Sequence, residues 1–126
     1  MKISFKQKGN FEKTTKYLKK MMKAFEKGVF DKYGRKGVSE LEKYTPIDTG
    51  ITAASWSYQV TKTDGEVMLE FLNDNVNDGV NIAVILQYGH GTGTGGYVEG
   101  VDYINPALKP VFESMVADIW KEVITV

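Results

Sequence analysis

The chain has 126 residues, of which 42% are hydrophobic and 25% charged, with one histidine and no cysteine. This composition predicts a single folded domain, residues 1–126, with one modest hydrophobic core. Without cysteine there can be no disulfide, thiolate nucleophile or cysteine-type zinc site. No apolar run approaches the ~20 residues that cross a bilayer, and residues 1–6 lack the apolar stretch of a signal peptide. We therefore expect a protein that is made in a cytoplasm and does not contact membranes.

Charge is distributed unevenly along the chain, although the net charge is zero. Residues 1–44 contain 13 Lys and Arg against 5 Asp and Glu, a balance of +8. Residues 45–126 contain 3 against 11, a balance of −8. Such asymmetry indicates binding to nucleic acid or to an oppositely charged partner, which in a ring can be the next copy of the same chain. The alternative is an ordinary solvated helix face.

The first third of the chain is predicted to form a short strand and a long helix. Residues 2–6 alternate between polar and apolar side chains, and Asn10 is a typical helix N-cap. Apolar residues then recur at helical spacing until Pro46 ends the helix. Glycine weakens a helix, so Gly34 and Gly37 predict a bend. A stripe of lysines occupies the opposite face: Lys13, Lys16, Lys20, Lys23 and Lys27.

The middle of the chain is predicted to form an antiparallel sheet. Residues 56–61 alternate in the period of a half-buried strand, and residues 66–72 supply its partner. Asp64-Gly65 between them is typical of a tight hairpin turn. Residues 73–81 form a polar loop. Residues 82–88 are almost continuously apolar, which predicts a central strand buried on both faces.

The last third is predicted to form a loop and a helix. Six of the twelve residues from Gly89 to Gly100 are glycine, which predicts a long mobile loop without regular structure. Asn105 and Pro106 are typical of an N-cap followed by the first helical residue, and helical spacing of apolar residues continues from there. The whole predicts an α+β fold: a long N-terminal helix, an antiparallel sheet of three to four strands, and a C-terminal helix, with both helices packed on one sheet face.

No segment carries a convincing catalytic or ligand-binding motif. The run Asn73–Gly79 resembles a calcium loop, but its glycine comes one position late and the position of the bidentate glutamate is apolar. The run Gly89–Gly96 matches neither phosphate-binding glycine motif and has no lysine nearby. His90 lacks partners for a metal site or a catalytic triad, so we expect it to make local hydrogen bonds. We predict no enzyme activity, cofactor, metal or small-molecule substrate.

Two parts of the sequence resemble a known protein family. The first is Thr45–Gly50 (TPIDTG) with Ala53–Trp56 (AASW). The second runs from Ile85–Gly91 (ILQYGHG) through Gly95–Gly100 (GGYVEG) to Tyr103–Ala107 (YINPA). Together they are similar to a pattern in the neck and head-tail joining proteins of long-tailed bacteriophages, also called minor capsid or minor tail proteins. The GGYVEG stretch most resembles members from phages and prophages of Gram-positive bacteria. Ile51-Thr52 departs from the family, in which many members carry a basic residue and a leucine.

The resemblance implies a structural virion protein without catalytic activity. It implies a homo-oligomeric ring for neck or tail completion, between the portal complex and the tail tube, with other neck, connector or tail proteins as partners and sequence-blind DNA contact in the lumen. Its location would be the virion, with assembly in the host cytoplasm. We expect the acidic surface of the sheet to meet the basic helix of the adjacent subunit. The candidate interface residues are Lys16, Lys20, Lys23, Lys27, Gly89, His90, Gly91, Gly93, Gly95, Gly96 and Tyr97.

A second set of residues is expected to be structural. Asp48 and Thr49 are predicted to form a turn that caps the short segment leading to Trp56. The motif comprises Pro46, Asp48, Thr49, Gly50, Trp56, Asn105 and Pro106. The predicted core comprises Phe25, Val29, Trp56, Leu69, Phe71, Val84, Leu86, Phe112, Met115 and Ile119.

Two other functions are compatible with the sequence. The first is a small nucleic-acid-binding module that uses the basic N-terminal third, which predicts salt-dependent retention on DNA. The second is a small enzyme or nucleotide binder that uses the glycine-rich segment around His90, which predicts ligand binding that His90→Ala abolishes.

Overall fold

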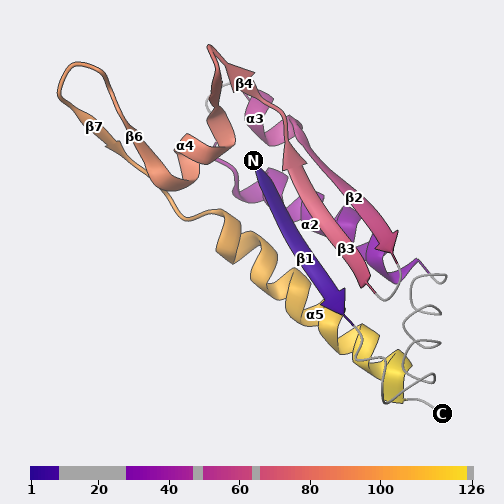
Figure 1. The fold of residues 1–126 in the computed structure, drawn as a ribbon. Coiled ribbons are helices and arrows are strands. Elements are labelled where there is room, and N and C mark those ends of the chain that lie inside the picture. Colours follow the sequence, from indigo (N-terminus) through magenta and orange to yellow (C-terminus); the bar gives the residue numbers. More distant parts are fainter. Residues whose placement is uncertain (9–27, 47–49, 64–65, 125–126) are drawn as a thin grey trace.

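The fold is described from a computed structural model, which covers residues 1–8, 28–46, 50–63 and 66–124 (Figure 1). In chain order its elements are β1 (Lys2–Lys8), α2 (Val29–Tyr44), α3 (Ile51–Ala54), β2 (Trp56–Thr63), β3 (Glu66–Asn73), β4 (Val76–Asn77), β5 (Val80–Asn81), α4 (Ile82–Tyr88), β6 (Gly89–Gly91), β7 (Tyr97–Glu99) and α5 (Ile104–Ile124).

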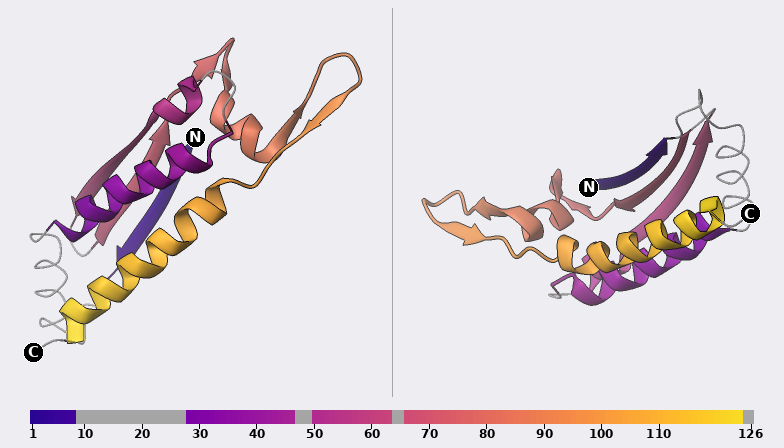
Figure 2. Two further views of the ribbon diagram at one scale, coloured as in Figure 1. Left: turned by 180° about the vertical axis from the view of Figure 1, so that it is seen from behind. Right: turned by 90° about the horizontal axis from the view of Figure 1, so that it is seen from below.

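The main body has two layers, a three-stranded sheet and a pair of helices. The sheet is antiparallel with the order β1-β3-β2. The helices α2 and α5 lie side by side on one face of this sheet (Figure 2). The predicted α+β class, with both helices on one face, is confirmed. The predicted hairpin is confirmed as well, because Thr63 of β2 is paired with Glu66 of β3.

The helix α2 is continuous through its two glycines. Gly34 and Gly37 lie on its buried face. A methyl group at Gly34 would come closer than 3.0 Å to the Tyr58 ring, and one at Gly37 would do the same to the Phe71 ring. The bare backbone at these positions lets the helix approach β2 and β3, and this packing outweighs the low helix propensity of glycine. The N-terminal part of the predicted long helix lies outside the described residues.

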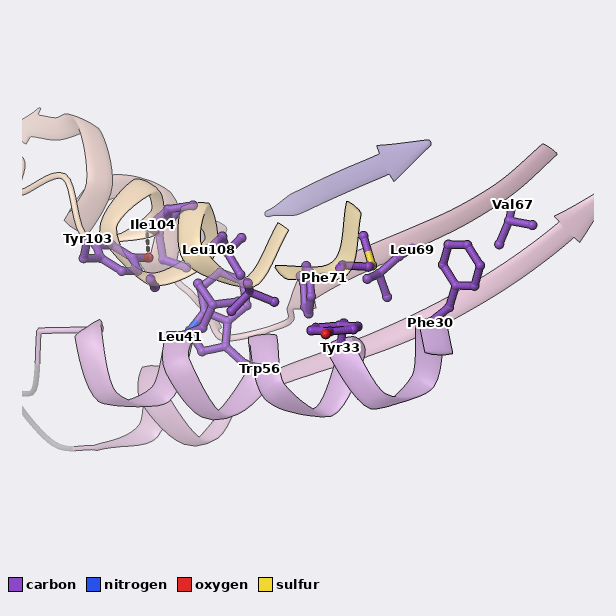
Figure 3. Close-up of a cluster of buried hydrophobic side chains, with 14 of the residues drawn as sticks. Phe30, Tyr33, Leu41, Trp56, Val67, Leu69, Phe71, Tyr103, Ile104 and Leu108 are labelled. Carbon is purple, nitrogen blue, oxygen red and sulfur yellow. Dashed lines mark hydrogen bonds between the residues drawn. The ribbon is translucent and has the colours of Figure 1, made fainter. Parts of the chain in front are cut away.

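The hydrophobic core fills the space between the helices and the sheet (Figure 3). Of the ten predicted core residues, five are buried, four are partly buried, and Phe25 lies outside the described part of the chain. The five are Trp56, Leu69, Phe71, Met115 and Ile119. The core also takes in further residues, chiefly from α2 and α5: Phe30, Tyr33, Leu41, Val67, Ala83, Tyr103, Ile104, Ala107, Leu108 and Val111.

The segment 82–88 forms the helix α4 rather than the predicted central strand. A short apolar run cannot be assigned to helix or strand from its periodicity alone. Here the side chain of Asn81 favours the helix, because its Oδ1 accepts a hydrogen bond from the Val84 N–H (3.3 Å) and so caps it. Only Ala83 of this helix is buried.

A polar contact joins the N-terminal part of α2 to the C-terminal part of α5. The Tyr33 hydroxyl of α2 donates a hydrogen bond to Asp118 Oδ2 of α5, and Lys32 Nζ lies 3.6 Å from the same oxygen. Burial, followed by the hydrogen bond to Asp118 and the charge of Asp118, raises the pKa of Tyr33 to about 12. The hydrogen bond from Tyr33 lowers the pKa of Asp118.

This contact predicts a specific loss of stability at high pH. Because the folded pKa of Tyr33 lies above its unfolded value of 10.0, its contribution is complete below pH ~10 and falls as the pH rises toward ~12. We expect Tyr33→Phe to lower the free energy of unfolding by about 1–2 kcal/mol at pH 8. At pH ~11 this loss should be smaller by about 1 kcal/mol. Urea unfolding at both pH values measures this difference. Tyr44→Phe, at an exposed position of the same helix, is the matched control.

Candidate interaction surface

The segment 89–100 forms a β-hairpin that projects away from the two layers (Figures 1 and 2). Its strands β6 and β7 are antiparallel, with His90 paired with Val98 and Gly91 paired with Tyr97. The prediction that this segment contains no regular element is therefore wrong. Glycine is required at the turn, where Gly93 and Gly95 have φ of 79° and 88°. We call residues 89–100 the arm.

The base of the arm is held by close backbone packing. A methyl group added to Gly100 would lie within 3.0 Å of the Gln87 carbonyl oxygen and of the Gly89 nitrogen. The backbone N–H of Val101 also donates to the Leu86 carbonyl oxygen at 2.9 Å. These contacts seat the arm directly on α4.

The side chain of Gln87 holds the arm between α4 and α5. Its Oε1 accepts hydrogen bonds from the Tyr103 and Ile104 N–H groups, both at 3.1 Å. Its Nε2 donates to Asp102 Oδ1 at 2.9 Å, and this bond, followed by that from Asn105, lowers the pKa of Asp102. The Tyr103 hydroxyl donates to the Ala83 carbonyl oxygen at 2.8 Å. The arm is thus built on a fixed base, although its tip is exposed.

A matched pair of glycine substitutions tests this base. Gly100→Ala must displace backbone, so we expect the arm amides to open more easily by about 1–3 kcal/mol. Gly91→Ala in the same arm meets nothing closer than 3.9 Å and should leave them unchanged. Hydrogen–deuterium exchange over residues 86–104 measures both variants. Equal protection in the two variants would contradict the described packing.

Large apolar side chains are exposed on and around the arm. Tyr88 and Tyr97 are 66% and 64% exposed, and Val98 and Val101 are 47% and 59% exposed. The Tyr97 hydroxyl donates to the Tyr88 carbonyl oxygen at 3.0 Å, which holds one aromatic side chain in place. Several large apolar side chains exposed on one projecting element are typical of surfaces that contact another protein.

The same end of the molecule carries the acidic charge. No Lys or Arg occurs between Lys62 and Lys109. Exposed carboxylates in this interval lie in the loop after β3, in the β4–β5 turn, on β7 and before α5: Asp74, Asp78, Glu99 and Asp102.

Among the residues whose side chains the structure describes, the outer face of the sheet carries one carboxylate, and that carboxylate is paired with a lysine. Its one buried carboxylate, Glu70, has Oε2 2.7 Å from Lys2 Nζ, and its Oε1 accepts a hydrogen bond from Gln59 Nε2 at 3.2 Å. Its charge is thus neutralised within the sheet. The acidic surface lies instead toward the arm.

The asparagines that resemble a calcium loop have a structural role. Asn73 Nδ2 donates to the Thr52 carbonyl oxygen (2.8 Å), Asn75 Nδ2 donates to Thr52 Oγ1 (2.7 Å), and Asn81 Nδ2 donates to the Asn73 carbonyl oxygen (3.1 Å). They join β3 to α3 and α4. Across the described residues, no cluster of three or more His, Asp or Glu side chains is placed to hold a metal ion.

The fold brings part of the predicted interface together. All of its glycines, with His90 and Tyr97, lie in the arm, whereas the four lysines 16, 20, 23 and 27 lie outside the described residues. The expectation that His90 makes local hydrogen bonds fails at one nitrogen, because its buried Nδ1 has no partner among the described residues. Gln87 supports the arm but was not predicted, because its role depends on contacts between separate elements.

Two residues of the predicted structural motif, Trp56 and Gly50, have a defined role in the fold. Trp56 is buried, and its Nε1 donates to Thr45 Oγ1 at 2.9 Å, which ties β2 to the end of α2. The N-cap of α3 is Gly50, with φ of 81°, while Asp48 and Thr49 lie outside the described residues.

The start of the C-terminal helix differs from the prediction. Helix α5 begins at Ile104, so Asn105 and Pro106 lie in its first turn. The capping side chain is Asp102, whose Oδ1 accepts from the Asn105 N–H at 3.3 Å. A carboxylate accepts this bond readily at a helix N-terminus.

Comparison of the chain with protein-family models, with curated protein sequences and with solved structures gives no match. In the part of the chain that the structure describes, no helix is both long and apolar enough to span a membrane.

Proposed function

We propose that this protein is a structural subunit of a tailed-phage virion that assembles as a ring at the head-tail junction. One observation carries the proposal. The second family-like segment, from Ile85 to Ala107, coincides with the arm, its base and the start of α5, where the exposed tyrosines and valines gather. A residue pattern that resembles that of neck proteins thus coincides with a surface suited to protein contact.

The distribution of charge also supports a ring. A heterologous contact joins two different surfaces of the same chain, and repetition of that contact closes a ring if the rotation allows. The N-terminal third of this chain is basic and the rest is acidic. Opposite charges on different surfaces favour head-to-tail contact over contact between identical patches.

The first test is the mass of the purified chain by light scattering after size exclusion, at low and high salt. We expect an oligomer of at least roughly six copies that weakens as salt screens the charges. The combined variant Lys16→Glu, Lys20→Glu, Lys23→Glu should lower the mass further, whereas Lys62→Glu, outside this basic stripe, is the control. An assembly insensitive to both salt and the triple change would contradict an electrostatic contact.

The alternative function is a sequence-blind nucleic-acid-binding module. It is motivated by the +8 balance of residues 1–44, 13 Lys and Arg against 5 Asp and Glu, and by exposed Arg35 and Lys36 on α2. This alternative predicts that the monomer is retained on DNA, with an affinity that falls steeply with salt. A monomer that binds DNA at every protein concentration tested would favour it over the ring.

A further inference from the structure

We propose that the arm of one copy docks on a second copy, where β7 adds as a strand along the free edge of β1 and places Tyr97 in the groove between β1 and α5. This inference rests on the proposed ring and names its contact. It follows from the groove, the strand edge and the charges on both surfaces.

The groove lies between β1 and α5 and is mainly apolar. Its volume is about 520 Å³, and its apolar lining includes Ile3 from β1 with Leu108 and Phe112 from α5. This size lies within the ~300–1,000 Å³ of pockets that enclose a small ligand. It can therefore receive a large side chain such as that of Tyr97.

Beside the groove runs an open strand edge. β1 is at the end of the sheet order β1-β3-β2, so within the described residues its other edge has no strand partner. An open edge presents unpaired N–H and C=O groups that a strand from another chain can use. In the arm, β7 pairs with β6 on one side and has an outer edge of its own.

The alternation of β7 gives two useful side chains on one face. Successive residues of a strand point to opposite faces, so Tyr97 and Glu99 share a face about 7 Å apart. If that face is turned to the groove and the Tyr97 hydroxyl gives up its hydrogen bond to the Tyr88 carbonyl oxygen, the Tyr97 ring meets the apolar lining and Glu99 meets the rim. Lys109 is the exposed cation on that rim.

Charge also sets the direction of β7 on its neighbour. Lys109 and Glu113 lie one helical turn apart on the rim of the groove. Glu99 is attracted to Lys109 and repelled by Glu113, so Tyr97 faces Phe112. Since β1 and α5 run in the same direction (Figure 1), this order makes β7 antiparallel to β1.

The occupant is a second copy of the chain because the two surfaces are complementary. The arm and its base carry Glu99 and Asp102 without a cation, and the groove presents Lys109. The two surfaces belong to different elements, so their contact is heterologous and can repeat from copy to copy.

The experiment is cross-linking between introduced cysteines, for which the chain is suited because it has no cysteine of its own. The variant with Glu99→Cys and Lys109→Cys is treated with a short bis-maleimide, because the backbones of an ion pair of long side chains are too far apart for a direct disulfide, and is separated on a denaturing gel. We expect a ladder of dimers, trimers and larger species. Equal mixing of the two single variants should give heterodimers only, because each chain then carries one reactive end. Glu99→Cys with Ser57→Cys, an exposed position on the opposite edge strand β2, is the control that should give no ladder.

A charge exchange gives an independent readout without cysteine. Glu99→Lys or Lys109→Glu alone should raise the concentration needed for assembly by about tenfold, and the two together should restore it. Both positions are exposed, so neither change should impair folding, which circular dichroism checks.

The results separate the arm contact from the ring itself. An oligomer by light scattering whose paired cysteines give no ladder overturns the arm contact and leaves the ring in place. A cross-linked product that migrates as a monomer also overturns it, because the arm then reaches its own groove. A monomer without cross-links at every concentration overturns both.

Discussion

Gly37→Ala is expected to destabilise the protein by about 2 kcal/mol, although alanine is the better helix former. On an exposed helix face this change would stabilise by roughly 0.5–1 kcal/mol. Here the added methyl group would overlap the buried Phe71 ring, and overpacking of a core costs about 1–3 kcal/mol. Chemical denaturation, read as a lower midpoint at an unchanged slope, measures the loss.

Whether Gly37→Ala destabilises or stabilises the protein should depend on the Phe71 ring that lies against Gly37. In a Phe71→Leu background the side chain opposite Gly37 is smaller, so Gly37→Ala should cost much less or become stabilising. Ser39→Ala, at an exposed position of the same helix, is the control for helix propensity alone. If Gly37→Ala stabilised the wild-type protein as Ser39→Ala does, the close approach of α2 to β3 would be wrong.

Leu69→Ala is expected to produce the largest loss of stability, about 3–4 kcal/mol. Leu69 is fully buried at the centre of β3, on the sheet face that the helices cover. Removing its side chain leaves a cavity between sheet and helices that close packing cannot fill. Thermal unfolding should show a fall of the melting temperature by more than about 10 °C for a domain of this size.

The matched control lies on the same strand. Leu72 points to the opposite face of the sheet and is only partly buried, so Leu72→Ala should cost about 1 kcal/mol. Equal losses for the two leucines would show that both sheet faces are covered to the same degree. That result would contradict the two-layer architecture.

Local patterns in the sequence determined the elements whose signals are strong and self-contained. The alternation in residues 56–61 and 66–72, with Asp64-Gly65 between them, is sufficient for the β2–β3 hairpin, because strand period and turn chemistry agree. The long helical spacing after Pro106 is likewise sufficient for α5, although Asp102 starts that helix earlier than expected. The absence of cysteine and the single histidine limit the available chemistry before any fold is known.

The tertiary structure decided the features that depend on contacts between distant segments. Gly34 and Gly37 remain in a helix because Tyr58 and Phe71 lie against them. Residues 82–88 place Ala83 in the core and accept a hydrogen bond from the distant Tyr103 hydroxyl, and a run this short is ambiguous by periodicity.

Only part of the candidate surface could be predicted from the sequence, because the rest depends on contacts between distant segments. Glycine content drew attention to residues 89–100, yet it predicted a loop where strand pairing makes an arm. Gln87 and Lys109 have no local signal that marks them, because Gln87 acts by joining α4 to the start of α5 and Lys109 by lining the groove beside β1. Local propensity covers a few neighbouring residues, whereas packing joins residues far apart along the chain.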